Sequence, residues 1–134
     1  MGEHPARARR RIVPDAAQMQ LILGSLLGGA RIEGEVGDRR LCIAEATHRA
    51  GYVWWKYERL AQFADEPPIS LDGHVSFSTI AHPIFDDVIG LPRERLAALL
   101  TPLGRSVRRT DELSDDALRL GEPADEEPSD LIRE

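Results

Sequence analysis

The sequence predicts an α+β fold in which a four-stranded antiparallel sheet has helices on one of its faces. Residues 30–46 and 67–80 alternate between apolar and polar side chains, and each stretch contains a turn signal typical of a β-hairpin. Residues 16–28 and 48–63, before and between these hairpins, have apolar side chains at helical spacing. A chain of 134 residues is long enough for one domain with a single core.

The first expected helix, 16–28, has two different faces. Asp15 and Gln18 before its apolar residues fit a capping box. The bulky face consists of Met19, Ile22, Leu23 and Leu26. The opposite face is nearly bare and consists of Ala17, Leu21, Gly24 and Gly28. Because glycine inside a helix costs about 1 kcal/mol, the bare face predicts that a second helix approaches closely. A buried core helix with incidental glycines is the alternative.

The first hairpin joins residues 30–36 to residues 39–46 through the turn pair Gly37-Asp38. Alternation places Ile32, Leu41 and Ile43 on the face that meets the core. The other face then carries Arg31, Glu33, Glu35, Arg40 and Cys42.

A second helix is expected over residues 48–63, with Thr47 as its N-terminal cap. Its buried stripe consists of Val53, Tyr57 and Leu60, which recur at helical spacing.

The second hairpin, 67–80, turns at Asp72-Gly73. Short helices are then expected from His82-Pro83 to Ile89 and from Pro92 to Leu100, because proline is favoured in the first turn of a helix. Thr101-Pro102 is the start of a further helix.

We expect three parts in the chain: a basic arm (1–14), a central domain (15–104) and a degenerate or acidic C-terminal tail (105–134). The arm contains Arg7, Arg9, Arg10 and Arg11. Residues 1–110 hold 15 basic and 13 acidic side chains, whereas residues 111–134 hold two basic and ten acidic ones. The arm could therefore bind phosphate groups, and the tail could compete with them.

Several classes of protein are disfavoured. Cys42 is the single cysteine, which excludes an intrachain disulfide and favours a reducing, cytoplasmic location. The histidines and Cys42 lack the spacing of metal ligands, so no metal site is assigned. The longest apolar run, residues 21–30, is too short to span a bilayer.

Four segments, taken in order, resemble one unit of the LAGLIDADG homing endonucleases. Residues 22–30 resemble the first helix of the branch that ends this helix in LLGDG. The segment YVWWKYERL resembles its second helix, SFSTIAHPIFDDV its second hairpin and next helix, and LLTPLG the beginning of a second unit. The resemblance covers about residues 12–104.

This resemblance implies a saddle-shaped sheet that lies in the major groove of double-stranded DNA, with helices behind it. Arg31, Arg39 and Arg40 would contact DNA, together with the four arginines of the arm. Two units would meet through their glycine-bearing helices, which implies a homodimer that uses Ala17, Leu21, Gly24 and Gly28. Acidic residues at the ends of these helices would hold Mg²⁺ for phosphodiester cleavage.

The sequence departs from the family pattern at this acidic position. Gly29 and Ala30 stand where the aspartate and the next glycine are expected. Glu33 and Glu112 are the remaining catalytic candidates, and Asp111-Glu112 falls where a second unit would have its acids. However, Arg105, Arg108 and Arg109 stand at three earlier positions that should be largely apolar in the corresponding helix of a second unit. An acidic tail that falls there by chance is the alternative.

The sequence leaves three functions open. The first is a single LAGLIDADG-like unit that binds DNA with impaired or lost cleavage. The second is an interaction or scaffold domain on the same fold that does not bind DNA. The third is an active homodimeric endonuclease with an unusual metal ligand.

Overall fold

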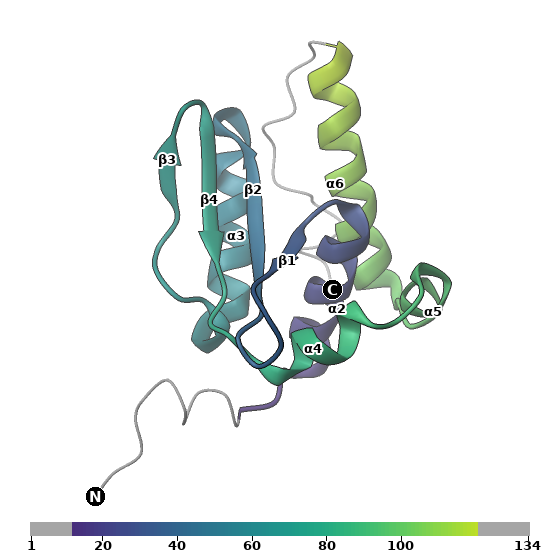
Figure 1. The fold of residues 1–134 in the computed structure, drawn as a ribbon. Coiled ribbons are helices and arrows are strands. Elements are labelled where there is room, and N and C mark those ends of the chain that lie inside the picture. Colours follow the sequence, from purple (N-terminus) through teal and green to yellow (C-terminus); the bar gives the residue numbers. More distant parts are fainter. Residues whose placement is uncertain (1–11, 121–134) are drawn as a thin grey trace, which may run out of the picture.

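The computed structural model describes the backbone of residues 12–120 and the side chains of residues 12–113. The fold is α+β, with one four-stranded antiparallel sheet, as predicted (Figure 1). The elements in chain order are α2 (Ala16–Gly28), β1 (Arg31–Glu33), β2 (Arg40–Ala46), η1 (Thr47–Arg49), α3 (Ala50–Leu60), η2 (Ala61–Phe63), β3 (Ile69–Leu71), β4 (His74–Ser78), α4 (Pro83–Ile89), α5 (Arg93–Ala98) and α6 (Pro102–Leu120).

The sheet joins two hairpins through their longer strands, in the order β1-β2-β4-β3. Ile43 of β2 lies opposite Phe77 of β4, and both side chains are buried. Leu41 and Val75 are buried on the same face, which packs against α3 and α2. Figure 1 shows α3 behind the sheet, and α2 and α6 side by side next to it. The opposite face of the sheet, which we call the outer face, carries the alternate residues.

Helix α2 is the central helix of the molecule. The predicted capping box is present, since Gln18 N donates to Asp15 Oδ1 at 2.7 Å and Asp15 N donates to Gln18 Oε1 at 3.0 Å. The helix is buried on more sides than the predicted bulky face, because Leu21 and Leu27 are buried as well. Leu26, which was predicted for the core, is only half-buried.

Several predicted boundaries differ from the structure because the chain turns earlier than its apolar pattern suggests. The first strand ends at Glu33, since Gly34 has a φ of 100° and leaves the extended region. The expected helix over 48–63 has an α-helical part, Ala50–Leu60, between two short 3₁₀ segments. The prediction that Thr47 caps this helix is wrong, because no side chain caps α3.

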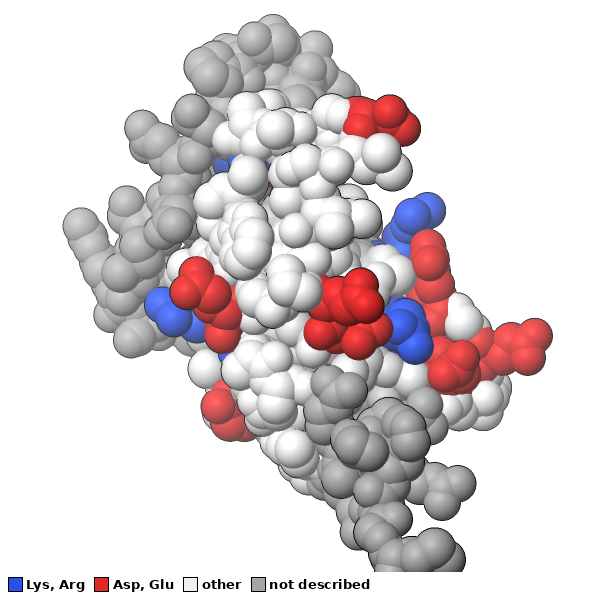
Figure 2. Space-filling model, turned by 90° about the vertical axis from the view of Figure 1, so that its left-hand side faces the viewer, with Lys and Arg blue, Asp and Glu red and all other residues white. Residues whose placement is uncertain are grey.

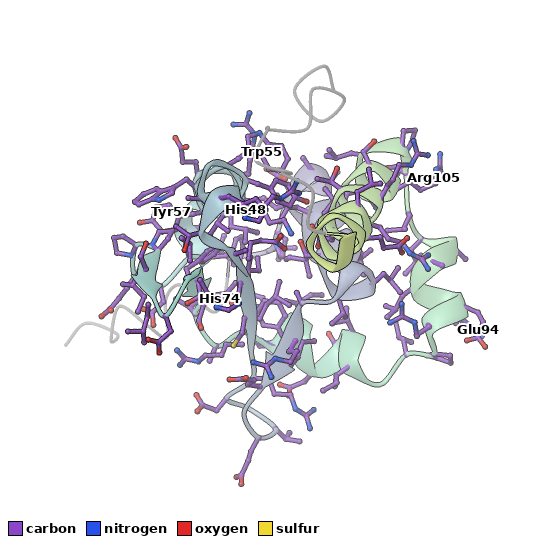
Figure 3. All side chains as sticks on the ribbon, turned by 90° about the horizontal axis from the view of Figure 1, so that it is seen from above. His48, Trp55, Tyr57, His74, Glu94 and Arg105 are labelled. Atoms are coloured by element: carbon purple, nitrogen blue, oxygen red, sulfur yellow. The ribbon has the colours of Figure 1, made fainter. Side chains whose placement is uncertain are left out.

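Helix α6 runs through the predicted domain boundary at residue 104. It forms the most extensive contact that α2 makes with any element. Seen from above, α6 lies next to α2, and α3 with its labelled Trp55 lies beyond them (Figure 3). None of the helices in the described part of the chain combines the length and apolar composition needed to cross a membrane.

Candidate functional site

The bare face of α2 is covered by α6 of the same chain. A Cβ atom added at Gly24 would lie 2.5 Å from the carbonyl oxygen of Gly104 and 2.8 Å from Cβ of Val107. One added at Gly28 would lie 2.5 Å from Cβ of Asp111. The prediction that a second helix approaches these glycines is therefore confirmed.

The prediction that a second copy of the chain provides this helix is not supported. Of the four residues assigned to a homodimer, Gly24 and Gly28 are in contact with α6, and Leu21 is buried in the core. Ala17 is exposed, at the start of α2. A second copy could reach the glycines only if α6 left its place. The physical reason is that residues 102–111 form a helix with a small residue, Gly104, facing Gly24.

Asp111 is the carboxylate that the structure places next to Gly28, at the end of α2. It is 4% exposed, and Lys56 Nζ lies 2.9 and 3.0 Å from its two oxygens. The hydroxyl of Tyr52 donates to Oδ1 at 2.6 Å. Because Lys56 is itself only 1% exposed, this ion pair is closed to solvent on both sides.

Two residues of this network were not among the predicted site residues. Tyr52 and Lys56 lie four residues apart on α3 and therefore share a face. Lys56 is the only lysine of the chain and stands in an apolar segment. A lysine at a buried helical position needs a carboxylate partner, so its spacing from Tyr52 and Leu60 was the available signal.

Burial raises the pKa of the Tyr52 hydroxyl, and the charge and hydrogen bond of Asp111 raise it further. Tyr52 thus remains a proton donor to Asp111. A second cation, Arg49, lies 5.0 Å from the ring centroid of Tyr52 and donates to the carbonyl of Thr110 at 3.3 Å. Arg49 also lies 3.7 Å from Glu45 of β2. These contacts connect β2, α3 and α6 by buried charges.

A cavity of about 70 Å³ lies at the end of α2, between β2 and the middle of α6. Its acidic lining residues are Glu45 and Asp111, and each has a basic partner, Arg49 and Lys56. These residues do not fit a divalent cation, because the ammonium group of Lys56 occupies both oxygens of Asp111. In the described part of the chain, no group of three or more Asp, Glu, His or Cys side chains has a metal-binding arrangement.

The two catalytic candidates, Glu33 and Glu112, lie on different elements and pair with different arginines. Glu33 Oε1 on β1 lies 3.3 Å from Arg31, and Glu112 Oε1 on α6 lies 2.9 Å from Arg108. Both side chains are more than half exposed. The structure therefore does not bring them together with Asp111 into one acidic centre.

The outer face of the sheet is where the predicted DNA contacts lie. Pairing places Arg31, Cys42 and Ser78 in one row across three strands. Arg40 lies in the next row and pairs with Asp65 at 3.3 Å. In the described part of the chain, the helices that contact the sheet lie on its other face.

Arg39, which was predicted to contact DNA, does not lie on the outer face. Its guanidinium is about one-fifth exposed and pairs with Asp86 of α4 at 3.3 Å, so it joins a loop to a helix. The arm residues Arg7, Arg9, Arg10 and Arg11 lie outside the described residues.

A groove of about 240 Å³ crosses the outer face near β3 and β4. Arg40, Asp65, Glu66 and Ile69 line it, together with the hydroxyl-bearing Ser76 and Ser78. Figure 2 faces the β3 side of the molecule and shows acidic side chains more prominently than basic ones, with uncharged surface between them. The charged side chains along this groove are Arg40, Asp65 and Glu66, so the groove has no excess of positive charge.

Comparisons with protein-family models, with curated proteins and with solved structures gave no match to this chain.

Proposed function

We propose that this chain is a LAGLIDADG-like unit that binds double-stranded DNA through the outer face of its sheet and does not cleave it. The observation that carries the proposal is the uncovered polar face with Arg31 and Arg40 on adjacent strands. Arginine suits phosphate and guanine because its guanidinium donates two parallel hydrogen bonds. Serine hydroxyls on β4 supply further donors to phosphate oxygens.

The lack of cleavage follows from the closed ion pair. A metal-dependent nuclease needs carboxylate oxygens that are free to hold Mg²⁺ next to the scissile phosphate. Both oxygens of Asp111 are held by Lys56, and the position before Ala30 is a glycine without a ligand atom. We expect no nicking of supercoiled plasmid DNA in the presence of Mg²⁺. Nicking that EDTA abolishes would favour the active-endonuclease hypothesis and contradict ours.

DNA binding is tested by fluorescence anisotropy of a labelled duplex between about 50 and 200 mM salt, where phosphate contacts lose strength steeply. The variant Arg31→Gln/Arg40→Gln should reduce the slope of log K against log salt by about 2, because each phosphate contact contributes about 0.9. Arg59→Gln is the matched control, since it removes one exposed charge from α3 on the other side of the sheet. If Arg59→Gln changes the salt slope as much as the double variant does, the DNA contact is not assigned to the outer face.

Cys42 provides an independent reporter of the same face. Its thiol lies between Arg31 and Ser78, and burial raises the pKa of this thiol. Bound DNA should slow its alkylation further, whereas an unchanged rate at saturating DNA would place DNA elsewhere.

A specific observation favours a second candidate, an interaction domain that does not bind DNA. Arg31 and Arg40 are each paired with a carboxylate, and the exposed Ile69 and Leu71 on β3 add apolar surface. This combination is also found at protein interfaces. No salt-dependent duplex binding at about 50 mM salt would select this second candidate.

A further inference from the structure

Three arginines of α6 line a groove between α6 and α5. Arg105, Arg108 and Arg109 share one face of the helix because they are three and four residues apart. The groove has a volume of about 260 Å³, and Ala97 and Leu100 form its apolar wall. Figure 3 shows Arg105 on the far side of α6 from α3, toward α5 with its labelled Glu94.

The groove has an excess of positive charge. Glu112, its one acidic lining residue, pairs with Arg108 at 2.9 Å. Arg105 and Arg109 are exposed, and in the described part of the chain no carboxylate lies within ion-pair distance of either. Arg105 donates to the carbonyl of Leu100 at 3.0 Å, which fixes its direction and leaves most of its five donor hydrogens available.

These arginines are not required for the packing of α6. The face of α6 that meets α2 consists of Gly104, Val107 and Asp111. The arginine face is turned about a quarter to a third of a turn away from it at 100° per residue. A charged groove beside, and separate from, the packed face calls for an anionic ligand.

We infer that the α5–α6 groove binds the phosphate backbone of nucleic acid, on a different side of the molecule from the outer face of the sheet. Arg105 and Arg109 are offset by about 6 Å along the helix axis. This offset is close to the roughly 6.8 Å of axial rise between alternate phosphates of one DNA strand. The inference rests on the proposed function for its ligand class, which is nucleic acid. It adds a second contact surface.

The test compares two sets of charges in the full chain. The variant Arg105→Gln/Arg108→Gln/Arg109→Gln should weaken binding of a labelled duplex about tenfold or more at 100 mM salt and reduce the salt slope by about 2 to 3. Ala97→Glu, which places a negative charge on the groove wall, should weaken binding in the same direction. Its matched control is Ala98→Glu, because Ala98 is an exposed neighbour on α5 that does not line the groove. Circular dichroism verifies that each variant is folded.

The outcomes separate this inference from the proposed function. If the groove variants and Arg31→Gln/Arg40→Gln all weaken binding, both surfaces contact DNA. If only the groove variants do, the groove is the DNA site and the outer face is not. If only the sheet variant does, or if Ala98→Glu acts as strongly as Ala97→Glu, the groove inference is overturned and the proposed function is unaffected. A wild-type chain that does not bind duplex DNA overturns both.

Discussion

At the scale of single residues, the buried pair of Lys56 and Asp111 has the largest consequence for both fold and function. Burying two charges in an apolar core costs several kcal/mol of desolvation free energy for each charge. The attraction between them offsets this cost only when their geometry is good. Here both carboxylate oxygens and the Tyr52 hydroxyl take part. The pair therefore fixes α6 against α3 and occupies both carboxylate oxygens of Asp111.

Lys56→Met should lower the free energy of unfolding by about 3–5 kcal/mol, because it leaves a buried carboxylate without its cation. Lys56→Met combined with Asp111→Asn should recover most of that loss, which chemical denaturation in urea would measure. Arg108→Met is the control, since it breaks the half-exposed pair with Glu112 and should cost less than about 1 kcal/mol. A loss in Lys56→Met as small as in this control would mean that the buried pair is not closed to water.

Tyr52 predicts how stability changes in alkali. Its pKa is raised in the folded protein by burial and by Asp111, whereas an unfolded chain releases the phenol proton near pH 10. Its contribution to stability is therefore complete below about pH 10 and decreases as the pH rises further. Unfolding followed from pH 8 to 11 should show a weaker alkaline loss in Tyr52→Phe. Tyr57→Phe is the control on the same helix, and equal pH dependence in wild type and Tyr52→Phe would contradict the assignment.

At the scale of elements, the glycines of α2 determine how closely α6 can lie. Gly24→Leu should destabilise the monomer, since even one added carbon meets the backbone of Gly104. Gly24→Ala should cost about 1–3 kcal/mol of stability from overpacking. The better helix propensity of alanine should offset this cost by up to about 1 kcal/mol. Thermal unfolding measures both variants. Ala17→Leu, at the exposed start of the same helix, should leave stability nearly unchanged.

Burial along α2 also separates two neighbouring leucines. Leu27→Ala should cost about 2–5 kcal/mol, because this side chain is buried between α2, α4 and α5. Leu26→Ala should cost less, because Leu26 is only half-buried. Urea unfolding of the two variants compares them directly, and the reverse order would mean that α2 is rotated from its place here.

Local patterns predicted most of the fold, because capping, alternation and turn chemistry act over a few residues. The Asp15–Gln18 box and the alternation of Leu41 and Ile43 are examples. The candidate site depended on contacts between distant segments. Asp111 lies 55 residues after Lys56 in the chain, and the spacing of acidic residues alone could not show that a lysine neutralises it. The glycine face predicted a helix partner correctly, but its pattern does not distinguish a helix of the same chain from one of another copy.

At the scale of the whole molecule, the contact between α2 and α6 predicts a monomer. A homodimer through the glycine face would require α6 to leave and would expose Val107 and the Lys56–Asp111 pair to water. Separating Asp111 from Lys56 would cost at least as much as breaking a buried ion pair. Sedimentation equilibrium should therefore give a mass near 14.9 kDa at micromolar concentration.

A matched pair of variants decides which surface is used if a dimer is found instead. Gly24→Leu should lower the dimer fraction if dimers form through the glycine face, because a helix of either copy packed on that face meets the added side chain. A surface variant of the exposed β3 strand, Ile69→Lys/Leu71→Lys, would lower the dimer fraction if dimers form by edge-to-edge pairing of sheets. A dimer that responds to neither variant would use a surface other than the glycine face and the β3 edge.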